Sequence, residues 1–123
     1  MPAYKAPLRD FDFVLNEVIQ VQNVIPSLPG YEEATQDVFA SYLEAAAKFC
    51  ENELAPINRA ADEEGCSFNP ADHSVTTPAG FKEAYQQYCE LGFTGLDCDP
   101  AYGGQCMPKV LAFLMMEMQC SAT

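Results

Sequence analysis

The feature that most constrains this chain is a segment near its end that is apolar on almost every side. The stretch from 110 to 119 reads VLAFLMMEMQ, and Glu117 and Gln119 are its only polar side chains. Pro108 stands just before it, at a place where prolines often begin helices. A helix that is apolar all round must be buried all round. Helices of this size elsewhere in the chain would cover one flank, so we expect the last helix to dock on a partner or on further polypeptide.

Periodic apolar residues predict an all-α fold of about four main helices. The first is expected after Asp10 as N-cap, with Phe13, Val14, Val18, Val21 and Val24 on its apolar side, and the connector PSLPG at 26–30 ends it. We therefore divide the chain into an N-terminal helix and connector, 1–30, and a helical domain, 31–123, which we expect to be truncated at its C-terminus.

The second helix is expected over 34–54, because its apolar residues form one stripe. These residues are Val38, Phe39, Tyr42, Leu43, Ala46, Phe49, Cys50 and Leu54. Pro56 either ends the helix, kinks it, or opens a short continuation that Gly65 caps.

The segment CSFNPADHSVTT, 66–77, is polar, and it allows either a short hairpin around NPAD or a surface loop, which the composition favours. Thr77 as N-cap, Pro78 at the first helical position and Gly92 as a stop then predict the third helix. Its apolar side carries Phe81, Ala84, Tyr85, Tyr88, Cys89 and Leu91.

Charge and composition exclude several classes of protein. The 123 residues suffice for one domain, and 6 basic against 18 acidic side chains give a net charge of −12. Such a chain repels nucleic acid and anionic lipid. Neither a secretory signal nor a membrane-spanning run is present, so we expect a cytoplasmic protein. The six cysteines are then expected to be reduced and mostly packed, and the lone His73 argues against a metal site.

Two side chains could in principle carry chemistry. Glu117 lies among methionines, where desolvation would raise the pKa of a catalytic base. Cys106 precedes a helix N-terminus and is expected to be the exposed, reactive thiol. A solvated carboxylate and a structural thiol are the favoured readings, because no hydride acceptor or nearby base accompanies them. We therefore expect no catalytic residue in this chain.

The segment LGFTGLDCDPAYGGQCMPKVLAFLMMEM, 91–118, resembles the N-terminal helical domain of acyl-CoA dehydrogenases. The resemblance extends through YKAPLRDFDFVLNEV, EAAAKFCENELAPINRAADEEGC and TTPAGFKEAYQQY, and so covers nearly the whole chain. It is similar to the subgroup with an N-terminal extension, which includes long-chain and methylthiopropionyl-CoA dehydrogenases.

The resemblance implies a parent enzyme that dehydrogenates the α,β-bond of an acyl-CoA thioester. Its middle and C-terminal domains would hold FAD and supply the catalytic glutamate, electron-transfer flavoprotein would accept the electrons, and the full-length protein is expected to be a homo-oligomer. This chain would help to shape the acyl-CoA site, with Tyr102, Gly103 and Gly104 in a substrate-channel or interdomain loop. The competing hypothesis is a non-enzymatic helical interaction module that docks through its apolar C-terminal helix.

The sequence departs from the family pattern at two positions. Cys106 occupies the place of the third glycine in Y-G-G-x-G, which matters if that residue has a positive φ angle. Met116 stands where the helix usually carries the first of two consecutive acids. The two adjacent glycines, Gly103 and Gly104, are expected to form a turn rather than a phosphate site, because Y-G-G-Q-C matches no nucleotide-binding fingerprint.

Overall fold

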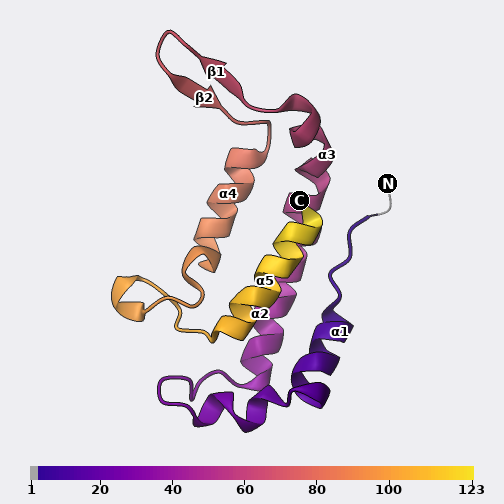
Figure 1. The fold of residues 1–123 in the computed structure, drawn as a ribbon, viewed down its shortest axis with the longest axis vertical. Coiled ribbons are helices and arrows are strands. Elements are labelled where there is room, and N and C mark those ends of the chain that lie inside the picture. Colours follow the sequence, from indigo (N-terminus) through magenta and orange to yellow (C-terminus); the bar gives the residue numbers. More distant parts are fainter. Residues whose placement is uncertain (1–2) are drawn as a thin grey trace.

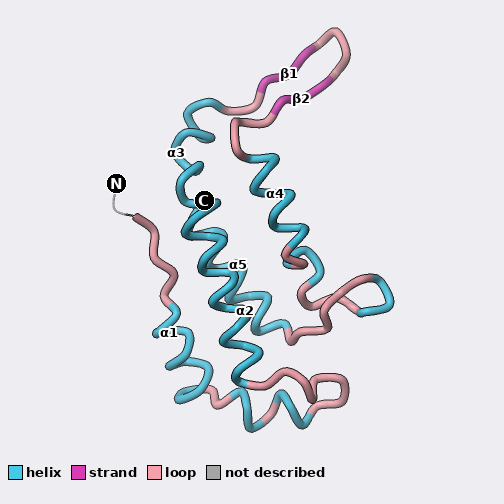
Figure 2. Tube along the Cα trace, turned by 180° about the vertical axis from the view of Figure 1, so that it is seen from behind, coloured by secondary structure: helices cyan, strands magenta, loops and turns pink. Residues whose placement is uncertain are grey.

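The computed structural model describes residues 3–123 as a helical body with one small hairpin (Figure 1). Helix α2 (Gln36–Phe49) runs through a π-helical segment, Cys50–Leu54, into α3 (Ala55–Glu64). Helix α5 (Lys109–Ala122) lies along α2, and the short α1 (Leu8–Asp12) packs on α2 as well. Helix α4 (Phe81–Glu90) stands apart in both views (Figure 2). The prediction of a helical fold is confirmed.

The core lies between α2 and α5. Leu43, Ala46 and Cys50 of the α2 run recur at intervals of three and four, and so do Leu111, Met115, Met118 and Ala122 of α5. None of these side chains is more than 6% exposed. This spacing puts each set on one face of its helix, where the two faces pack together. Thr35 caps α2 by accepting a hydrogen bond from the Val38 amide at 3.5 Å.

Pro56 neither ends nor breaks the helical run. The amide of Ala55 donates to the Cys50 carbonyl, five residues back, which is a π-helical bond. Pro56 then falls in the first turn of α3, where its missing N–H is tolerated. Gly65 ends α3 with a φ angle of 67°, and its amide donates to the Ala61 carbonyl. Of the three alternatives for Pro56, the structure therefore shows the short continuation.

The predicted apolar side of the first helix is wrong. The helix begins at Leu8, before Asp10, and changes to π-helical geometry over Phe13–Val18. Phe11 and Leu15 are the buried residues, whereas Phe13, Val14 and Val18 are exposed. A π-helical turn accommodates one additional residue, so the face read from a regular 3.6-residue period does not persist. Of the predicted residues, Val21 alone is buried.

Residues 66–77 contain a hairpin where a loop was favoured. Strands β1 (Ser67–Asn69) and β2 (Ser74–Thr76) pair antiparallel, with Phe68 opposite Val75. Within the turn the Asn69 side chain accepts from the Ala71 amide and the Asp72 side chain from the Ser74 amide, both at 3.0 Å. Each strand has three residues, all exposed, and only one of them is apolar, so the alternation is too short to indicate a strand.

The third predicted helix starts later than expected. Residues 78–80 form a turn in which the Phe81 amide donates to the Pro78 carbonyl, and α4 begins only at Phe81. Gly80, with a φ angle of 83°, interrupts helical geometry after Pro78. Thr77 is therefore not its N-cap.

Helix α5 is buried on one side only. Phe113 is 59% exposed and Met116 is 48% exposed, on the side away from the α2 contact. The expectation that the other helices cover one flank is confirmed for residues 3–123. Within the same range, no helix combines the length and the apolar character that crossing a bilayer requires.

Candidate functional site

The segment that joins α4 to α5, residues 91–108, is folded back on itself. Short 3₁₀ turns span Phe93–Gly95 and Pro100–Tyr102. The amides of Gln105, Cys106 and Met107 donate to the carbonyls of Gly95, Cys98 and Leu96, respectively, at 2.9 to 3.0 Å. These bonds pair the two halves of the connection, which we call the glycine loop. It is therefore an ordered element, held by its own backbone.

The two adjacent glycines are required for different reasons. At Gly104 a Cβ atom would lie 2.1 Å from the Cys98 carbonyl oxygen, so only glycine fits between the halves of the loop. Gly103 has a φ angle of 84° and open space around its Cα, so its requirement is conformational. The turn of the glycine loop thus depends on close approach at one glycine and on backbone angle at the other.

Cys106 also adopts a left-handed backbone, with a φ angle of 55°. The position that glycine usually occupies in this motif therefore does need a positive φ angle here. A residue with a side chain accepts this conformation at a cost of about 1–2 kcal/mol. The Cys106 thiol points toward the Gly30 carbonyl, with the two atoms 3.9 Å apart.

The three predicted site residues are consecutive but differently placed. Tyr102 is 90% exposed at the end of a 3₁₀ turn, Gly103 is exposed, and Gly104 is half-buried. Asp99 caps this turn, because its side chain accepts a hydrogen bond from the Ala101 amide at 2.8 Å. Tyr102 is therefore presented to solvent by a fixed backbone.

An ion pair joins the glycine loop to the start of α5. The Lys109 ammonium group donates to the Asp97 carboxylate, and this hydrogen bond lowers the pKa of Asp97 and raises the pKa of Lys109. Lys109 is largely exposed, so the pair contributes little to the free energy of folding. It orients the loop relative to α5 more than it stabilises either.

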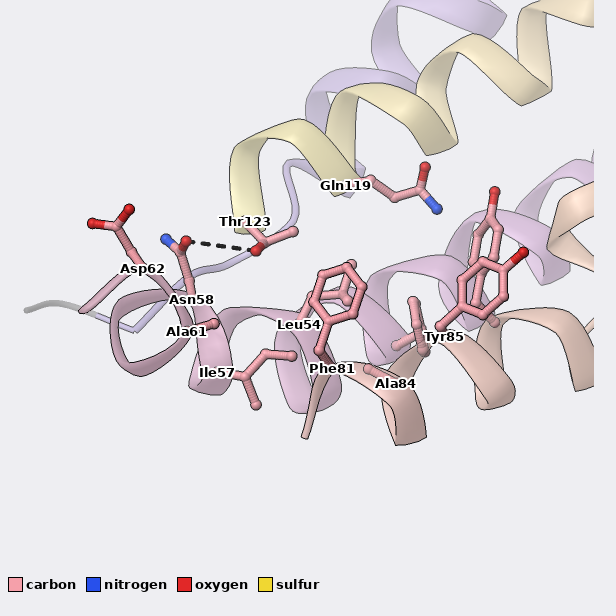
Figure 3. A pocket seen from close by; sticks show the side chains of 12 residues that line it. Leu54, Ile57, Asn58, Ala61, Asp62, Phe81, Ala84, Tyr85, Gln119 and Thr123 are labelled. Carbon is pink, nitrogen blue, oxygen red and sulfur yellow. Dashed lines mark hydrogen bonds between the residues drawn. The ribbon is translucent and has the colours of Figure 1, made fainter. Parts of the chain in front are cut away.

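A second feature is an apolar groove between α4 on one side and α3 with the C-terminal end of α5 on the other (Figure 3). It has a volume of about 460 Å³. Phe81, Ala84 and Tyr85 line it from α4, Ile57 and Ala61 from α3. At one end the Thr123 hydroxyl donates to the Asn58 side chain at 3.5 Å. We call this the α4/α5 groove.

The α4/α5 groove adjoins a second hollow of about 270 Å³, and Tyr88 and Gln119 line both. Phe113 and Met116 of α5 lie in this second hollow, together with Asp97 and Lys109. The exposed apolar side of α5 therefore faces open space that continues along α4 to the base of the glycine loop. Tyr102, Gly103 and Gly104 line neither hollow.

Comparison with known proteins decides the family. A profile of the acyl-CoA dehydrogenase N-terminal domain matches residues 39–123, which include α2 from Phe39 onward, α3, α4, α5 and the whole glycine loop. The chain belongs to the acyl-CoA dehydrogenase family. The resemblance read from the sequence is thereby confirmed, and with it the helical fold of the N-terminal domain.

Three named relatives support the same family assignment. It is 32% identical to 3-methylmercaptopropionyl-CoA dehydrogenase of Ruegeria pomeroyi, with 97% of the chain aligned, and 32% identical to butyryl-CoA dehydrogenase of Syntrophomonas wolfei, with 98% aligned. It is 27% identical to the broad-specificity linear acyl-CoA dehydrogenase FadE5 of Mycobacterium tuberculosis, with 95% aligned. The chain spans about a fifth of the length of these curated relatives.

The glycine loop of this acyl-CoA dehydrogenase domain is not shaped to hold a phosphate group. Such a site needs backbone N–H groups that point outward. Here the Gly103 amide donates to the Pro100 carbonyl and the Gly104 amide to the Asp99 carbonyl, each at 3.0 Å. Lys109 is engaged by Asp97. The residues of the loop therefore do not fit the pyrophosphate of a flavin dinucleotide, and the prediction of a turn is the better description.

The structure also shows the surroundings of the side chains that could carry chemistry. Glu117 is exposed on α5, so the desolvation that would make it a catalytic base is absent. Among residues 3–123, no three potential metal ligands lie close enough together to bind an ion.

The expectation of mostly packed thiols is wrong. All six cysteines are unpaired, but only Cys50 is buried, and burial together with the nearby Glu51 raises its pKa to about 11. Cys89 and Cys120 are exposed on their helices, whereas Cys106 is only half-exposed. Helix α4 buries little besides Ala84, which leaves its cysteine uncovered.

Sequence reasoning identified the apolar residues of α4 but missed the groove that they line. Phe81 is 50% exposed and Tyr85 is 61% exposed, although both lie on the predicted apolar side. Periodicity tells which side of a helix is apolar, and it does not tell whether another helix covers that side. The hairpin joins α3 to α4 (Figure 1), and α4 touches the α2–α3 run through a few residues, such as Tyr88 against Phe49, so most of its apolar side stays uncovered.

Proposed function

We propose that this chain forms part of an FAD-dependent acyl-CoA dehydrogenase and helps to shape the site at which an acyl-CoA thioester is oxidised between its α- and β-carbons. Binding and orientation of substrate are the contributions of this domain. FAD, the catalytic base and the hydride transfer belong to the middle and C-terminal domains of the parent enzyme. The glycine loop presents Tyr102, Gly103 and Gly104 toward the substrate channel or toward a neighbouring domain.

The match to the family over residues 39–123 carries this proposal, because it contains the glycine loop in full. The geometry of the loop supports it. Gly104 permits a close backbone approach that a side chain would prevent, and Tyr102 is exposed on an ordered turn. Rigid presentation of an aromatic side chain limits the entropy lost when a ligand or another domain is bound.

The partners follow from the same proposal. The α4/α5 groove is the surface on which the rest of the polypeptide rests, because its lining is apolar and the relatives are about five times as long as this chain. Acyl-CoA is the substrate, electron-transfer flavoprotein is the electron acceptor, and the full-length protein assembles as a homo-oligomer.

Activity of the isolated chain tests the division of labour. The 123-residue chain should not oxidise acyl-CoA in the presence of an artificial electron acceptor, because it lacks the base and the flavin site. The longer polypeptide that carries it should be yellow and active. Turnover by the 123-residue chain alone would contradict the proposal.

Substitution of the two glycines tests the role of the loop in the longer polypeptide. Gly104→Ala places a Cβ against the Cys98 carbonyl and should displace the turn, whereas Gly103→Ala costs only about 1–2 kcal/mol of backbone strain. We expect the KM for acyl-CoA to rise more for Gly104→Ala than for Gly103→Ala. Equal, unchanged KM values in two folded variants would remove the loop from the substrate site.

The alternative, a helical interaction module without enzymatic activity, is favoured by one observation, the open α4/α5 groove. Absorption of bound flavin in the protein purified at its full length discriminates between the two. Stoichiometric flavin supports the enzyme, and a colourless, folded, full-length protein that resists reconstitution with FAD supports the module.

A further inference from the structure

The side chain of Gln105 makes a bridge that the glycine loop itself does not require. Its amide oxygen accepts a hydrogen bond from the Tyr42 hydroxyl of α2, and its amide nitrogen donates to the Gly92 carbonyl at 3.3 Å. Its backbone amide also donates to the Gly95 carbonyl at 2.9 Å. One residue thus connects α2, the end of α4 and the first half of the glycine loop. We call these two side-chain contacts the Gln105 bridge.

The surroundings of the bridge fix the direction of the amide group. The Gly92 carbonyl can only accept a hydrogen bond, so the NH₂ group of Gln105 must face it, and the oxygen then faces the Tyr42 hydroxyl. Gly92 leaves room for this arrangement, because a Cβ there would lie 1.9 Å from the Gln105 amide nitrogen. Gly92 also has a φ angle of 77°, which ends α4. A shorter or apolar side chain at 105 would take this partner from the half-buried Tyr42 hydroxyl, and it would leave the Gly92 carbonyl with only the 3.4 Å bond from the Gly95 amide.

The bridge lies next to the predicted site residues in the chain. Gln105 follows Gly104 directly, and Cys106 after it donates its amide to the Cys98 carbonyl. Tyr42 is 63 residues away in sequence and belongs to the packed part of the domain. The turn that carries Tyr102 is therefore linked to α2 through Gln105, in addition to the burial of Phe93 and Leu96 of the same loop in the core, whereas Lys109 and Asp97 connect the loop to the exposed start of α5.

We infer that Gln105 is a positioning residue for the acyl-CoA site, and that it acts by holding the Tyr102–Gly104 turn at a fixed place relative to α2 through Tyr42. This inference rests on the proposed function of the glycine loop. Gln105 touches neither substrate nor cofactor in this role. Its loss is expected to weaken substrate binding more than it slows the chemical step.

The variants separate the two halves of the bridge. Gln105→Met keeps the length and removes both hydrogen bonds. Gln105→Glu keeps the acceptor for Tyr42 but turns a carboxylate oxygen toward the Gly92 carbonyl, and Tyr42→Phe removes only the hydroxyl. The matched control is Gln87→Met, because Gln87 also joins two helical segments by one side-chain hydrogen bond, to Glu53 at 3.3 Å, away from the loop.

Amide hydrogen exchange on the 123-residue chain measures the local opening of the loop. We expect the amides of Gly104, Gln105 and Cys106 to exchange about tenfold faster in Gln105→Met, and less so in Tyr42→Phe, because hydrogen bonds of ordinary net strength are lost. Gln105→Glu should be at least as fast as Gln105→Met. The control should leave these amides unchanged.

Kinetics of the longer polypeptide test the positioning role. Gln105→Met should raise the KM for acyl-CoA by roughly threefold to tenfold and change kcat by less than about twofold, which is the pattern of lost uniform binding. The doubly substituted Tyr42→Phe, Gln105→Met protein should be no worse than Gln105→Met, because both remove the same bridge.

The outcomes distinguish this inference from the proposed function. If Gln105→Met lowers thermal stability like the control but leaves KM and amide exchange as in the unmodified protein, Gln105 is merely structural and the inference is wrong. If the unmodified full-length protein does not oxidise acyl-CoA at all, the proposed function fails. Faster exchange would then still establish the bridge, and its assignment to the acyl-CoA site would be overturned.

Discussion

Helix α5 has apolar residues on two sides, and the two sides are buried to different degrees. Toward α2 its side chains are almost fully enclosed, with Leu111 1% exposed and Met118 inaccessible. On the other side, Phe113 and Met116 remain about half exposed and border the second hollow, which the first half of the glycine loop and Tyr88 of α4 also line. Both sides carry apolar residues, so composition does not separate them. The difference teaches that the contact with α2 holds this domain together, whereas the side with Phe113 and Met116 leaves apolar surface uncovered.

The largest expected effect comes from truncating one residue on each side of α5. Leu111→Ala should lower the free energy of unfolding by about 2–5 kcal/mol, because it leaves a cavity in the packed contact. Phe113→Ala should lower it by less than about 1 kcal/mol, because much of that ring is already in water. Chemical denaturation of both variants measures the two values. Similar losses for the two would abolish the distinction between the sides.

Thiol reactivity follows the same distinction. Cys50 in the α2 contact should react with a maleimide at least about a hundredfold more slowly than Cys89 and Cys120, because it is buried and its pKa is raised to about 11. Mass spectrometry after timed labelling identifies the sites. The structure also reverses the sequence-based order, in which Cys106 came first, because Cys106 is less exposed than Cys89 or Cys120. Labelling of Cys50 at the rate of Cys89 would show that the core contact opens readily.

Self-association of the chain reports on the open side. We expect the unmodified chain to dimerise or aggregate at tens of micromolar, and Phe113→Gln with Met116→Gln to reduce this, because both side chains are exposed apolar surface. Leu111→Gln with Met115→Gln is the contrasting pair, since these residues are core and their substitution should unfold the chain. Sedimentation velocity distinguishes the cases. A stable unmodified monomer would mean that the exposed side of α5 needs no cover.

The smallest expected effect on the free energy of unfolding comes from the left-handed backbone of Cys106 in the glycine loop. Cys106→Gly should raise the free energy of unfolding by about 0.5–1 kcal/mol, because glycine adopts the φ angle of 55° without strain but adds entropy to the unfolded chain. Cys98→Gly serves as the control and should lower it, since Cys98 has no left-handed backbone to relieve. Thermal unfolding of both variants gives the comparison. Destabilisation by Cys106→Gly would show that its thiol contact to Gly30 outweighs the strain.

The sequence predicted the core contact better than the open side. The stripe from Phe39 to Cys50 and the start of α5 after Pro108 were both found, because regular periodicity and capping residues are local signals. The first helix was misread, since a π-helical segment changes which residues share a face. The hairpin was missed because its strands are exposed and very short.

The position of the glycine loop could be predicted from the sequence, whereas its geometry could not. The motif around Tyr102 identified the glycine loop. Because Cys106 replaces a glycine of that motif, the sequence also indicated that a positive φ angle at this position would matter. The approach of Gly104 to Cys98 and the contact between Gln105 and Tyr42 depend on how the chain returns on itself. Such long-range pairings leave no periodic trace in a single sequence.

The π-helical segment at Cys50–Leu54 determines how α3, and the hairpin after it, are rotated relative to α2. One residue beyond the regular period turns everything that follows by about 100° around the helix axis. Deleting one residue there would bring α2 and α3 into a common phase, and Ile57 and Ala61 would then point away from α4. The hairpin would then project from the helical body in a different direction. One additional residue before Pro56 therefore determines which face of α3 lines the α4/α5 groove.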